Sequence, residues 1–421
     1  MKKNETKLIA FYLPQFHINP INNSLWGDGF TEWTNVAQAR PNFAGHYQPH
    51  IPGKLGFYDL SFVQTLRAQV ALAKQYGLYG FCFYYYWFDG QRALELPLDN
   101  FLSSEIDFPF CLCWANENWS RKWDGGNDEV VLKQSYGEEF EAKFVSSIES
   151  FLKDKRYILH DGKPVLIIYR PSLFRDPKRS LSLFRKAAQN LGFSGLHLLV
   201  VDFYLGLEEA QAMGADGVVE FPPHQFYDHD TLVDRAPGRI LNKEYKGHLL
   251  DYRKFISRSL TKWLEPSPLS LYRGIIPSWD NTARRKNTSV TVVYNSPKLY
   301  EAWLTYLLKY SEERNSSYLF INAWNEWGEG CHLEPDRKDG LAYLTATQQA
   351  LIKSKNISLE DAKNTLRDDL SQELASSLEI DEEAETTQEK QIISFKDFLR
   401  SQLFRYPRIF NLCRKIYKKV W

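Results

Sequence analysis

The chain contains 421 residues, and its 52 lysines and arginines balance its 52 aspartates and glutamates. This balance provides no general attraction for nucleic acid or for acidic ligands. Hydrophobic residues make up 43% of the chain and aromatic residues 15%, which is enough for a sizeable core. Five cysteines without framework spacing argue against a disulfide-stapled secreted protein. We find neither a signal peptide nor an apolar stretch of about 20 residues, so we expect an intracellular protein without a membrane span.

Short β-rich runs alternate with amphipathic stretches up to about residue 352. The predicted strands are Leu8–Leu13, Gly80–Trp87, Phe110–Trp114, Val165–Tyr169, His197–Asp202, Gly217–Glu220, Gly274–Trp279 and Tyr318–Trp324. The predicted helices are Phe62–Tyr76, a short one at Arg92–Leu102, Glu138–Leu152, Leu181–Leu191, Leu207–Met213, Tyr252–Trp263, Pro297–Tyr310 and Tyr343–Lys353. Eight such alternating units favour a closed (β/α)8 barrel of the α/β class, a TIM barrel. No strand is followed by a Gly-x-Gly-x-x-Gly or Walker loop, which argues against a doubly wound nucleotide-binding fold.

The character of the chain changes after residue 353, so we predict three parts. Residues 1–353 form the catalytic barrel. Residues 354–391 are acidic and poor in aromatics, which predicts a solvated linker that is partly helical or disordered. Residues 392–421 interleave basic with large apolar residues, which is typical of an amphipathic helix on an anionic membrane surface. The alternative is a helix that packs on the barrel or binds a partner.

The stretch Phe320–Pro335, with the sequence FINAWNEWGEGCHLEP, places three acids directly after a predicted buried strand. These acids are Glu326, Glu329 and Glu334. Like charges held close together raise one another's pKa, so one group keeps a proton while another stays ionised. The alternative is a polar loop with its acids in solvent.

Other predicted strands also end in aromatic residues beside an acid, an amide or a histidine, as in YYYWF, CWANENW, VEFPPH and PSWDN. The active sites of (β/α)8 barrels lie at these carboxyl ends. Aromatic rings suit the apolar faces of sugars, and acids or amides bind hydroxyl groups. The candidate substrate-binding residues are Trp26, Asp28, Glu32, Trp33, Tyr86, Trp87, Trp114, Asn116, Glu117, Asn118, Trp119, His224, Trp279, Asp280, Trp324, Asn325, Trp327 and Glu334.

Other chemistries have weaker support in the sequence. His46 and His50 are the only closely spaced histidines, and the proline within GHYQPH disfavours helical ligand geometry, so we expect no metal and no other cofactor. A serine nucleophile would need a Gly-x-Ser-x-Gly elbow, which is missing. The acids around Cys331 raise rather than lower the pKa of a thiol. Acid–base chemistry by carboxylates is therefore the leading interpretation.

A series of motifs over residues 7–350 resembles the WbsX family, which comprises glycosyltransferases of bacterial O-antigen and capsule clusters. These motifs are FYLPQFH, WGDGFTEWTNV, GHYQPH, LGFYDL, YGFCFYYYWF, CLCWANENW, GKPVLIIYRP, EFPPH, PSWDNTARR and INAWNEWGEGCHLEPD. That family is related to glycoside hydrolase family 99, whose members are retaining endo-acting α-mannosidases with a (β/α)8 fold.

The resemblance implies roles for two residues of the Glu-Trp-x-Glu loop. Glu326 would be the base that assists the 2-hydroxyl of the substrate through an anhydro-sugar intermediate, and Glu329 the general acid/base. Gly328 stands where the hydrolases usually carry a bulkier side chain. We expect a cytoplasmic enzyme, peripheral on the inner membrane face, that acts on an oligosaccharide or lipid-linked glycan in lipopolysaccharide or capsule biosynthesis. Retaining glycosyl transfer is favoured, and glycan hydrolysis or a non-catalytic glycan-binding barrel are the alternatives.

Overall fold

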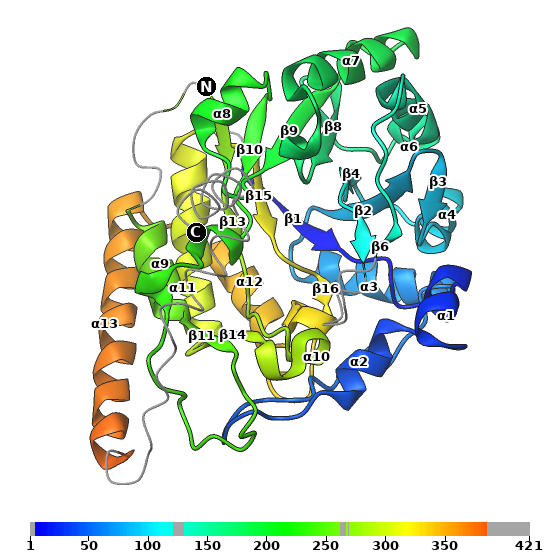
Figure 1. Ribbon diagram of the computed structural model, residues 1–421. Coiled ribbons are helices and arrows are strands. Elements are labelled where there is room, and N and C mark those ends of the chain that lie inside the picture. The colour runs from blue at the N-terminus through cyan, green and yellow to red at the C-terminus, as the bar shows by residue number, and fades with distance from the viewer. Residues whose placement is uncertain (1–4, 121–129, 262–266, 268, 385–421) are drawn as a thin grey trace, which may run out of the picture.

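The computed structural model describes residues 5–120, 130–261, 267 and 269–384 (Figure 1). The predicted basic tail, residues 392–421, and its predicted membrane contact lie outside the described residues. Within the described part of the chain, no helix is both long and apolar enough to cross a membrane.

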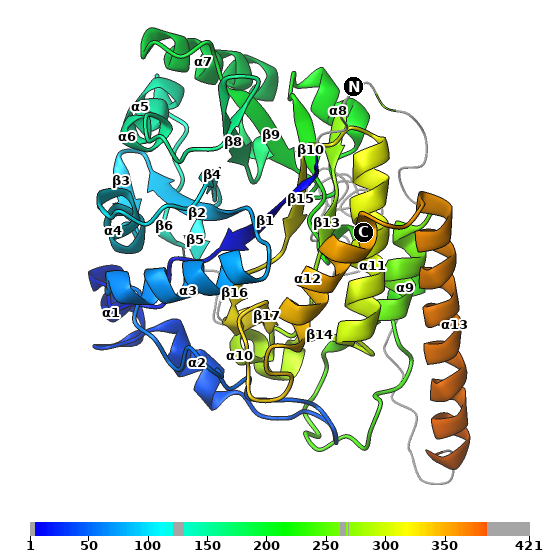
Figure 2. The ribbon, with the colours of Figure 1, turned by 180° about the vertical axis from the view of Figure 1, so that it is seen from behind.

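The centre of the molecule is a parallel barrel surrounded by helices (Figures 1 and 2). Its strands are β1 (Lys7–Tyr12), β2 (Gly80–Phe88), β4 (Phe110–Trp114), β8 (Lys163–Ile168), β9 (His197–Val201), β10 (Gly217–Val219), β12 (Ser270–Tyr272), β13 (Gly274–Ile275) and β15 (Tyr318–Ile321). They are hydrogen-bonded in the order β12-β10-β9-β8-β4-β2-β1-β15-β13. The predicted (β/α)8 barrel is confirmed.

The seventh position of the barrel holds β12 and β13 together, where the sequence predicted one strand starting at Gly274. β12 pairs with β10 and β13 pairs with β15, so the interruption at Arg273 lies where the barrel closes. The buried Arg273 side chain donates from Nε to Glu220 Oε2 at 2.8 Å. A Cβ at Gly274 would lie 2.0 Å from the Glu220 carbonyl oxygen, so only glycine fits there.

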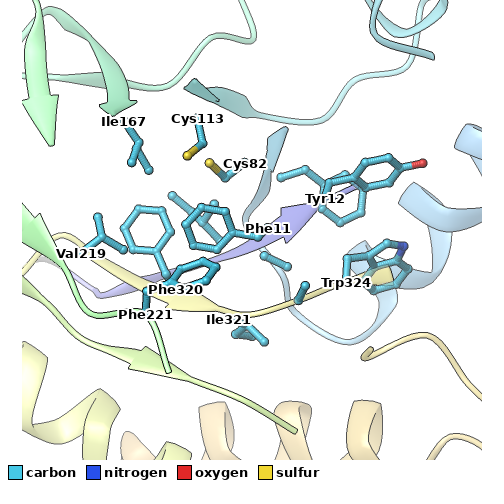
Figure 3. Packing of buried hydrophobic residues seen from close by; sticks show 14 of the residues in the cluster. Phe11, Tyr12, Cys82, Cys113, Ile167, Val219, Phe221, Phe320, Ile321 and Trp324 are labelled. Carbon is cyan, nitrogen blue, oxygen red and sulfur yellow. The ribbon is translucent and has the colours of Figure 1, made fainter. Parts of the chain in front are cut away.

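The barrel interior is packed with aromatic side chains (Figure 3). Parallel strands are apolar on both faces because one face meets the interior and the other meets the surrounding helices. The ring centroid of Phe11 lies 5.0 Å from that of Phe221 and 5.6 Å from that of Phe320. This solid interior leaves the carboxyl ends of the strands as the place for a site.

The outer helices are α3 (Val63–Gln75), α4 (Leu96–Ser103), α5 (Phe140–Ser147), α6 (Glu149–Leu152), α7 (Pro177–Asn190), α8 (Leu207–Ala212), α9 (Tyr252–Ser259), α11 (Pro297–Glu313) and α12 (Ala342–Ser354). Helix α11 begins as its sequence predicts, because Ser296 accepts a hydrogen bond from the Leu299 N–H and proline occupies the first turn. The single helix predicted over Glu138–Leu152 is instead two helices, interrupted at Ile148. The Arg92–Leu102 segment holds the end of strand β3 (Gln91–Ala93) before α4 begins.

Helix α13 (Leu359–Ala384) occupies most of the segment predicted as a solvated linker. Its residues Ala362, Leu366 and Leu370 recur every four positions and are buried. Figure 2 shows α13 beside α9 and α11, and α13 packs on α11. An acidic sequence with one apolar stripe therefore adds a helix to the outer layer, where composition alone predicted exposure to solvent.

Candidate active site

The loop after β15 carries the predicted catalytic residues. It forms a short antiparallel pair, β16 (Asn325–Glu326) with β17 (Cys331–His332), joined by the 3-10 helix η6 (Trp327–Glu329). Two other elements converge on η6, α2 (Glu32–Gln38) and α10 (Thr282–Arg285). Acids from this loop and from α2 are thereby brought to one point beside α10.

Arg284 of α10 joins three carboxylates at that point. Its Nη2 donates to Glu326 Oε2 at 3.0 Å, and its Nη1 lies 2.8 Å from Glu329 Oε1. Its Nε donates to Glu32 Oε1 at 3.1 Å. Arg284, Glu32 and Glu326 are buried, whereas the Glu329 side chain is 23% exposed. Arg284 contacts all three acids and Arg285 also acts on Glu329, so three acids and two guanidinium groups meet here, and the cluster is negative unless it binds a proton.

Burial makes the charged forms of these acids costly. It raises the pKa of Glu326 to about 8; Arg284 opposes this shift, while repulsion from Glu329 and Glu32 adds to it. Burial also raises the pKa of Glu329, again against the effect of Arg284. Because the two carboxyls titrate together, the pair keeps a proton at neutral pH. One acid can then donate a proton while the other accepts one.

Gly328 lies between the two acids, and the cluster requires its lack of a side chain. A Cβ there would lie 2.3 Å from Glu32 Oε1 and 2.6 Å from Arg284 Nε. Glycine is required at this position because the Arg284–Glu32 pair fills the space that a side chain would occupy.

A cleft of about 550 Å³ reaches Glu326 and Glu329. One wall is aromatic, with the ring of Tyr86 stacked 5.7 Å from that of Trp119. The other predicted polar residues in the lining are Glu117, Asn118 and His224. Stacked rings beside hydrogen-bonding groups are the surface that a sugar ring requires.

A second pocket, of about 180 Å³, shares Arg284, Glu329 and His224 with the cleft and is also lined by Trp279. Glu329 therefore borders two cavities. An acid between two cavities is placed to exchange a proton with an oxygen that joins a group in one to a group in the other.

The predicted site residues are only partly brought together. The cleft and the second pocket are lined by Tyr86, Glu117, Asn118, Trp119, His224, Trp279, Glu326 and Glu329. Asp28 is exposed in the loop after helix α1 (Pro20–Trp26), and Trp26 stacks on Phe30 with its centroid 6.4 Å from that of Trp119. Neither residue lines the cleft.

Eight predicted ligands are instead buried and line neither the cleft nor the second pocket. Trp114, for example, stacks on Phe144 at 4.1 Å, and Asn325 ties the end of β1 by accepting from the Leu13 N–H at 2.8 Å. The eight are Trp33, Trp87, Trp114, Asn116, Trp324, Asn325, Trp327 and Glu334. Glu32 is also buried and pairs with Arg284.

Asp280 is buried as well, with His46 Nε2 and Gln48 Nε2 each 2.6 Å from its Oδ2. Burial alone would raise the pKa of Asp280, but His46 and a hydrogen bond from Thr282 lower it to about 2. Asp280 is thus a fixed anion that holds the 46–48 segment, and it lines neither the cleft nor the second pocket.

The sequence reasoning missed Arg284, although the NTARR motif contains it. The sequence carries no short-range signal for this role, because Glu32, Glu326 and Glu329 are brought to Arg284 only by the fold. Tyr84, Tyr169 and Phe203 were also missed as lining residues of the cleft. Tyr84 and Tyr86 lie two apart on β2, so the alternation of a strand places both on the same face.

Comparison with known proteins gives a family and a fold. The family described as "Glycosyltransferase WbsX" matches residues 8–347. Two proteins named "Uncharacterized protein WxcX", from two strains of Xanthomonas campestris pv. campestris, are 39% and 38% identical over 362 residues. The match covers 84% of this chain and 50% of each relative, so the chain spans about half the length of these curated relatives.

Solved structures share the barrel. The GH99 endo-alpha-mannosidase from Bacteroides thetaiotaomicron in complex with BIS-TRIS-Propane superposes with a TM-score of 0.50 and 14% identity, over 85% of this chain and 98% of that one. A "Glycoside hydrolase-like protein" gives 0.51 and 15%, over 83% and 94%. At such identities the likeness concerns the fold alone. The family match and the fold support a carbohydrate-active enzyme, and because the match covers most of the chain, this protein belongs to the WbsX glycosyltransferase family.

Proposed function

We propose that this protein transfers a glycosyl unit during the assembly of a bacterial cell-surface polysaccharide, such as O-antigen or capsule, with retention at the anomeric carbon. The observation that carries the proposal is that Glu326 and Glu329 share the Arg284 guanidinium beside an aromatic cleft. Two carboxyls that hold one proton between them are what retaining glycosidic chemistry requires.

In the first half of the proposed reaction, the Glu326 carboxylate takes the proton of the donor sugar's 2-hydroxyl. O2 then bonds to C1, the bond from C1 to the leaving oxygen breaks, and the Glu329 carboxyl protonates that oxygen. In the second half, an acceptor hydroxyl bonds to C1 while the C1–O2 bond breaks. Glu329 takes the acceptor's proton and Glu326 returns its proton to O2, so both acids end as they began.

This sequence needs the charge on Glu326 and the proton on Glu329 at the start. Burial raises the pKa of both acids, so without substrate Glu326 and Glu329 share a proton at neutral pH. A 2-hydroxyl that donates a hydrogen bond to Glu326 favours its charged form, and a leaving oxygen that accepts from Glu329 favours the protonated form. In the proposed mechanism, substrate binding therefore moves the shared proton to Glu329.

The two cavities support a substrate with sugars on both sides of the reacting bond. We assign the larger cleft to the donor, an oligosaccharide or lipid-linked glycan, because Tyr86 and Trp119 form its stacking wall. The pocket beside Trp279 is assigned to the acceptor. The proposal sets this reaction at the cytoplasmic membrane face, where a lipid-linked glycan would be presented.

Hydrolysis of the same glycan is the second candidate function. The Glu329 side chain is 23% exposed, so a water molecule can reach it in place of an acceptor hydroxyl. The chemistry at Glu326 and Glu329 is the same with either acceptor.

A mass-spectrometric assay separates the two candidates. The protein is incubated with lipid-linked glycan extracted from host membranes, with Glu329→Gln as the matched control. Transfer adds sugar mass to an acceptor, and hydrolysis removes it from the glycan. An unchanged glycan profile with the unaltered protein would contradict both.

A further inference from the structure

A third cavity, of about 290 Å³, lies behind the catalytic loop. Trp279 lines both this cavity and the pocket beside Glu329. Three possible metal ligands line the cavity, His50, His332 and Asp336, and all three are buried. One nitrogen or oxygen atom from each lies within 4.8 Å of those from the other two. Glycosyl transfer as proposed above uses none of them.

Two loops far apart in the sequence bring these ligands together. The Gly53 N–H donates to the Pro335 carbonyl at 2.7 Å, and the Arg337 N–H donates to the Ile51 carbonyl at 2.8 Å. A Cβ at Gly53 would lie 2.9 Å from the carbonyl oxygens of Pro335 and Asp336. The two loops are therefore in close backbone contact on both sides of the three ligands. These backbone contacts fix the positions of the ligand-bearing segments relative to each other.

Each ligand on the later loop is oriented by a second contact. His332 Nδ1 lies 2.9 Å from the Glu334 carbonyl, so Nδ1 carries the proton and Nε2 presents its lone pair. The His332 ring stacks on Trp327 at 3.7 Å. The Asp339 N–H donates to Asp336 Oδ1 at 2.7 Å. Metal-binding histidines and carboxylates are held by outer partners of these kinds.

We propose that His50, His332 and Asp336 bind a divalent first-row transition metal ion, with Zn²⁺ the best fit. Two imidazoles and one carboxylate are a recurrent zinc ligand set that leaves a fourth position for water or another ligand oxygen. His50 Nδ1 and His332 Nε2 are 2.9 Å apart, and a tetrahedral ion requires about 3.4 Å between two nitrogen ligands. An opening of about half an ångström between the rings therefore admits the ion.

The ion would tie the 46–53 segment to the catalytic loop, because His332 pairs with Asn325 in the β16–β17 ladder and stacks on Trp327. From the sequence, His50 could be paired only with the nearby His46. Its partner in the structure, His332, is 282 residues away in the chain. The competing explanation is a metal-free hydrogen bond between two neutral imidazoles.

Metal content distinguishes these explanations without an activity assay. The full chain is stripped with chelator, dialysed against about 10 µM Zn²⁺ and measured by elemental analysis; we expect one Zn²⁺ per chain. Bound Zn²⁺ should raise the thermal unfolding midpoint, and Co²⁺ in its place should give the intense visible absorption of a tetrahedral site. Fewer than about 0.1 Zn²⁺ per chain would overturn the proposal, whatever the variants do.

Variants locate the ion. His332→Gln and Asp336→Asn should each weaken Zn²⁺ binding by at least about 100-fold, since loss of a direct ligand exceeds the 10–100-fold typical of outer partners. His160→Gln removes a histidine elsewhere, and Asp339→Asn removes a neighbouring acid; both should bind within about three-fold of the unaltered chain. Equal binding by all four would place the ion elsewhere and overturn the assignment. If His332→Gln fails to fold, the metal affinity of Asp336→Asn and the Co²⁺ spectrum of the unaltered chain still test whether the ion binds at these residues.

Discussion

The two ends of the loop from Glu326 to Glu334 place the same residue type in different surroundings. At one end, Glu326 and Glu329 share a buried guanidinium and border a cleft. At the other end, Glu334 accepts from three neutral groups: Tyr58 Oη at 2.8 Å, Gln69 Nε2 at 2.7 Å and Trp327 Nε1 at 2.7 Å. Burial raises the pKa of Glu334 to about 7, so a raised pKa occurs at both ends.

The difference lies in the hydrogen-bonding partners and in access to the aromatic cleft, which Glu326 and Glu329 line and Glu334 does not. The neutral donors around Glu334 hold its carboxyl group in one position. The hydrogen bond from Trp327 also fixes the Trp327 ring behind the catalytic loop. A shared guanidinium instead stabilises negative charge on either of two acids, which lets a proton move between them at little cost. A perturbed pKa is thus not sufficient to identify a catalytic acid, and the type of partner separates the two cases.

The largest expected effect is on turnover. Glu326→Gln and Glu329→Gln should each lower kcat/KM by about 10³-fold or more, because each removes a proton-transfer group. Glu334→Gln is the matched control from the same loop, and its kcat/KM should stay within about ten-fold of the unaltered chain. The measurement is initial rates on the native glycan, with folding checked by circular dichroism.

Normal turnover by either Glu326→Gln or Glu329→Gln would remove the two-carboxylate mechanism. A loss in Glu334→Gln as large as that in the other two would show that the distinction between the two ends of the loop is wrong.

The next largest effect is expected from a steric clash at Gly328 rather than from the loss of a charged group. Gly328→Ala puts a Cβ 2.3 Å from Glu32 Oε1, so the Arg284–Glu32 pair has to move. We expect kcat/KM to fall by about 10–100-fold and unfolding to become easier by about 1–3 kcal/mol. Gly137→Ala is the control, since its Cβ would meet only Ser135 Oγ at 3.8 Å. Equal activity of the two variants would mean that Arg284 does not have to be held in place.

The barrel could be predicted from sequence because it depends on local patterns. Each strand is a short apolar run followed by an amphipathic stretch, and parallel strands buried on both faces produce that pattern directly. The interruption at Arg273 could not be predicted, because it depends on an ion pair with Glu220, 53 residues earlier in the chain. The packing of helix α13 on the barrel layer did not follow from its acidic composition, because that composition conceals a single apolar stripe.

The site was predicted less completely, for a geometric reason. An aromatic residue at the end of a strand can line the cleft or can pack between the strands and the outer helices, and its residue type does not distinguish the two positions. Tyr86 faces the cleft, whereas the next residue, Trp87, packs on Phe144 of α5, so the period of two decides the outcome. Arg284 has no short-range signal, because its three partners lie 252, 42 and 45 residues away.

A smaller effect is expected on binding. Trp119→Ala removes the ring that stacks with Tyr86 in the cleft wall, and should weaken glycan binding by roughly 3–10-fold through lost stacking. Trp87→Phe is the control from the layer outside the cleft; it should lower stability but leave the Kd unchanged. Both are measured by titration calorimetry with the Glu329→Gln background, so that no turnover occurs. An unchanged Kd for Trp119→Ala would show that the aromatic wall is structural only.

The last effect concerns stability and pH, not turnover or binding, at the other end of the loop. The pKa of Glu334 is raised from 4.5 to about 7 in the folded chain, so the native state binds a proton more tightly than the unfolded state does. Its contribution is therefore complete below pH 4.5 and is lost as the pH rises to 7, at a cost of about 3 kcal/mol for this shift. Glu334→Gln cannot titrate, so its unfolding free energy should fall less between pH 5 and 8 than that of the unaltered chain. Chemical denaturation at several pH values measures this difference, and parallel curves for the two proteins would mean that Glu334 stays ionised in the fold.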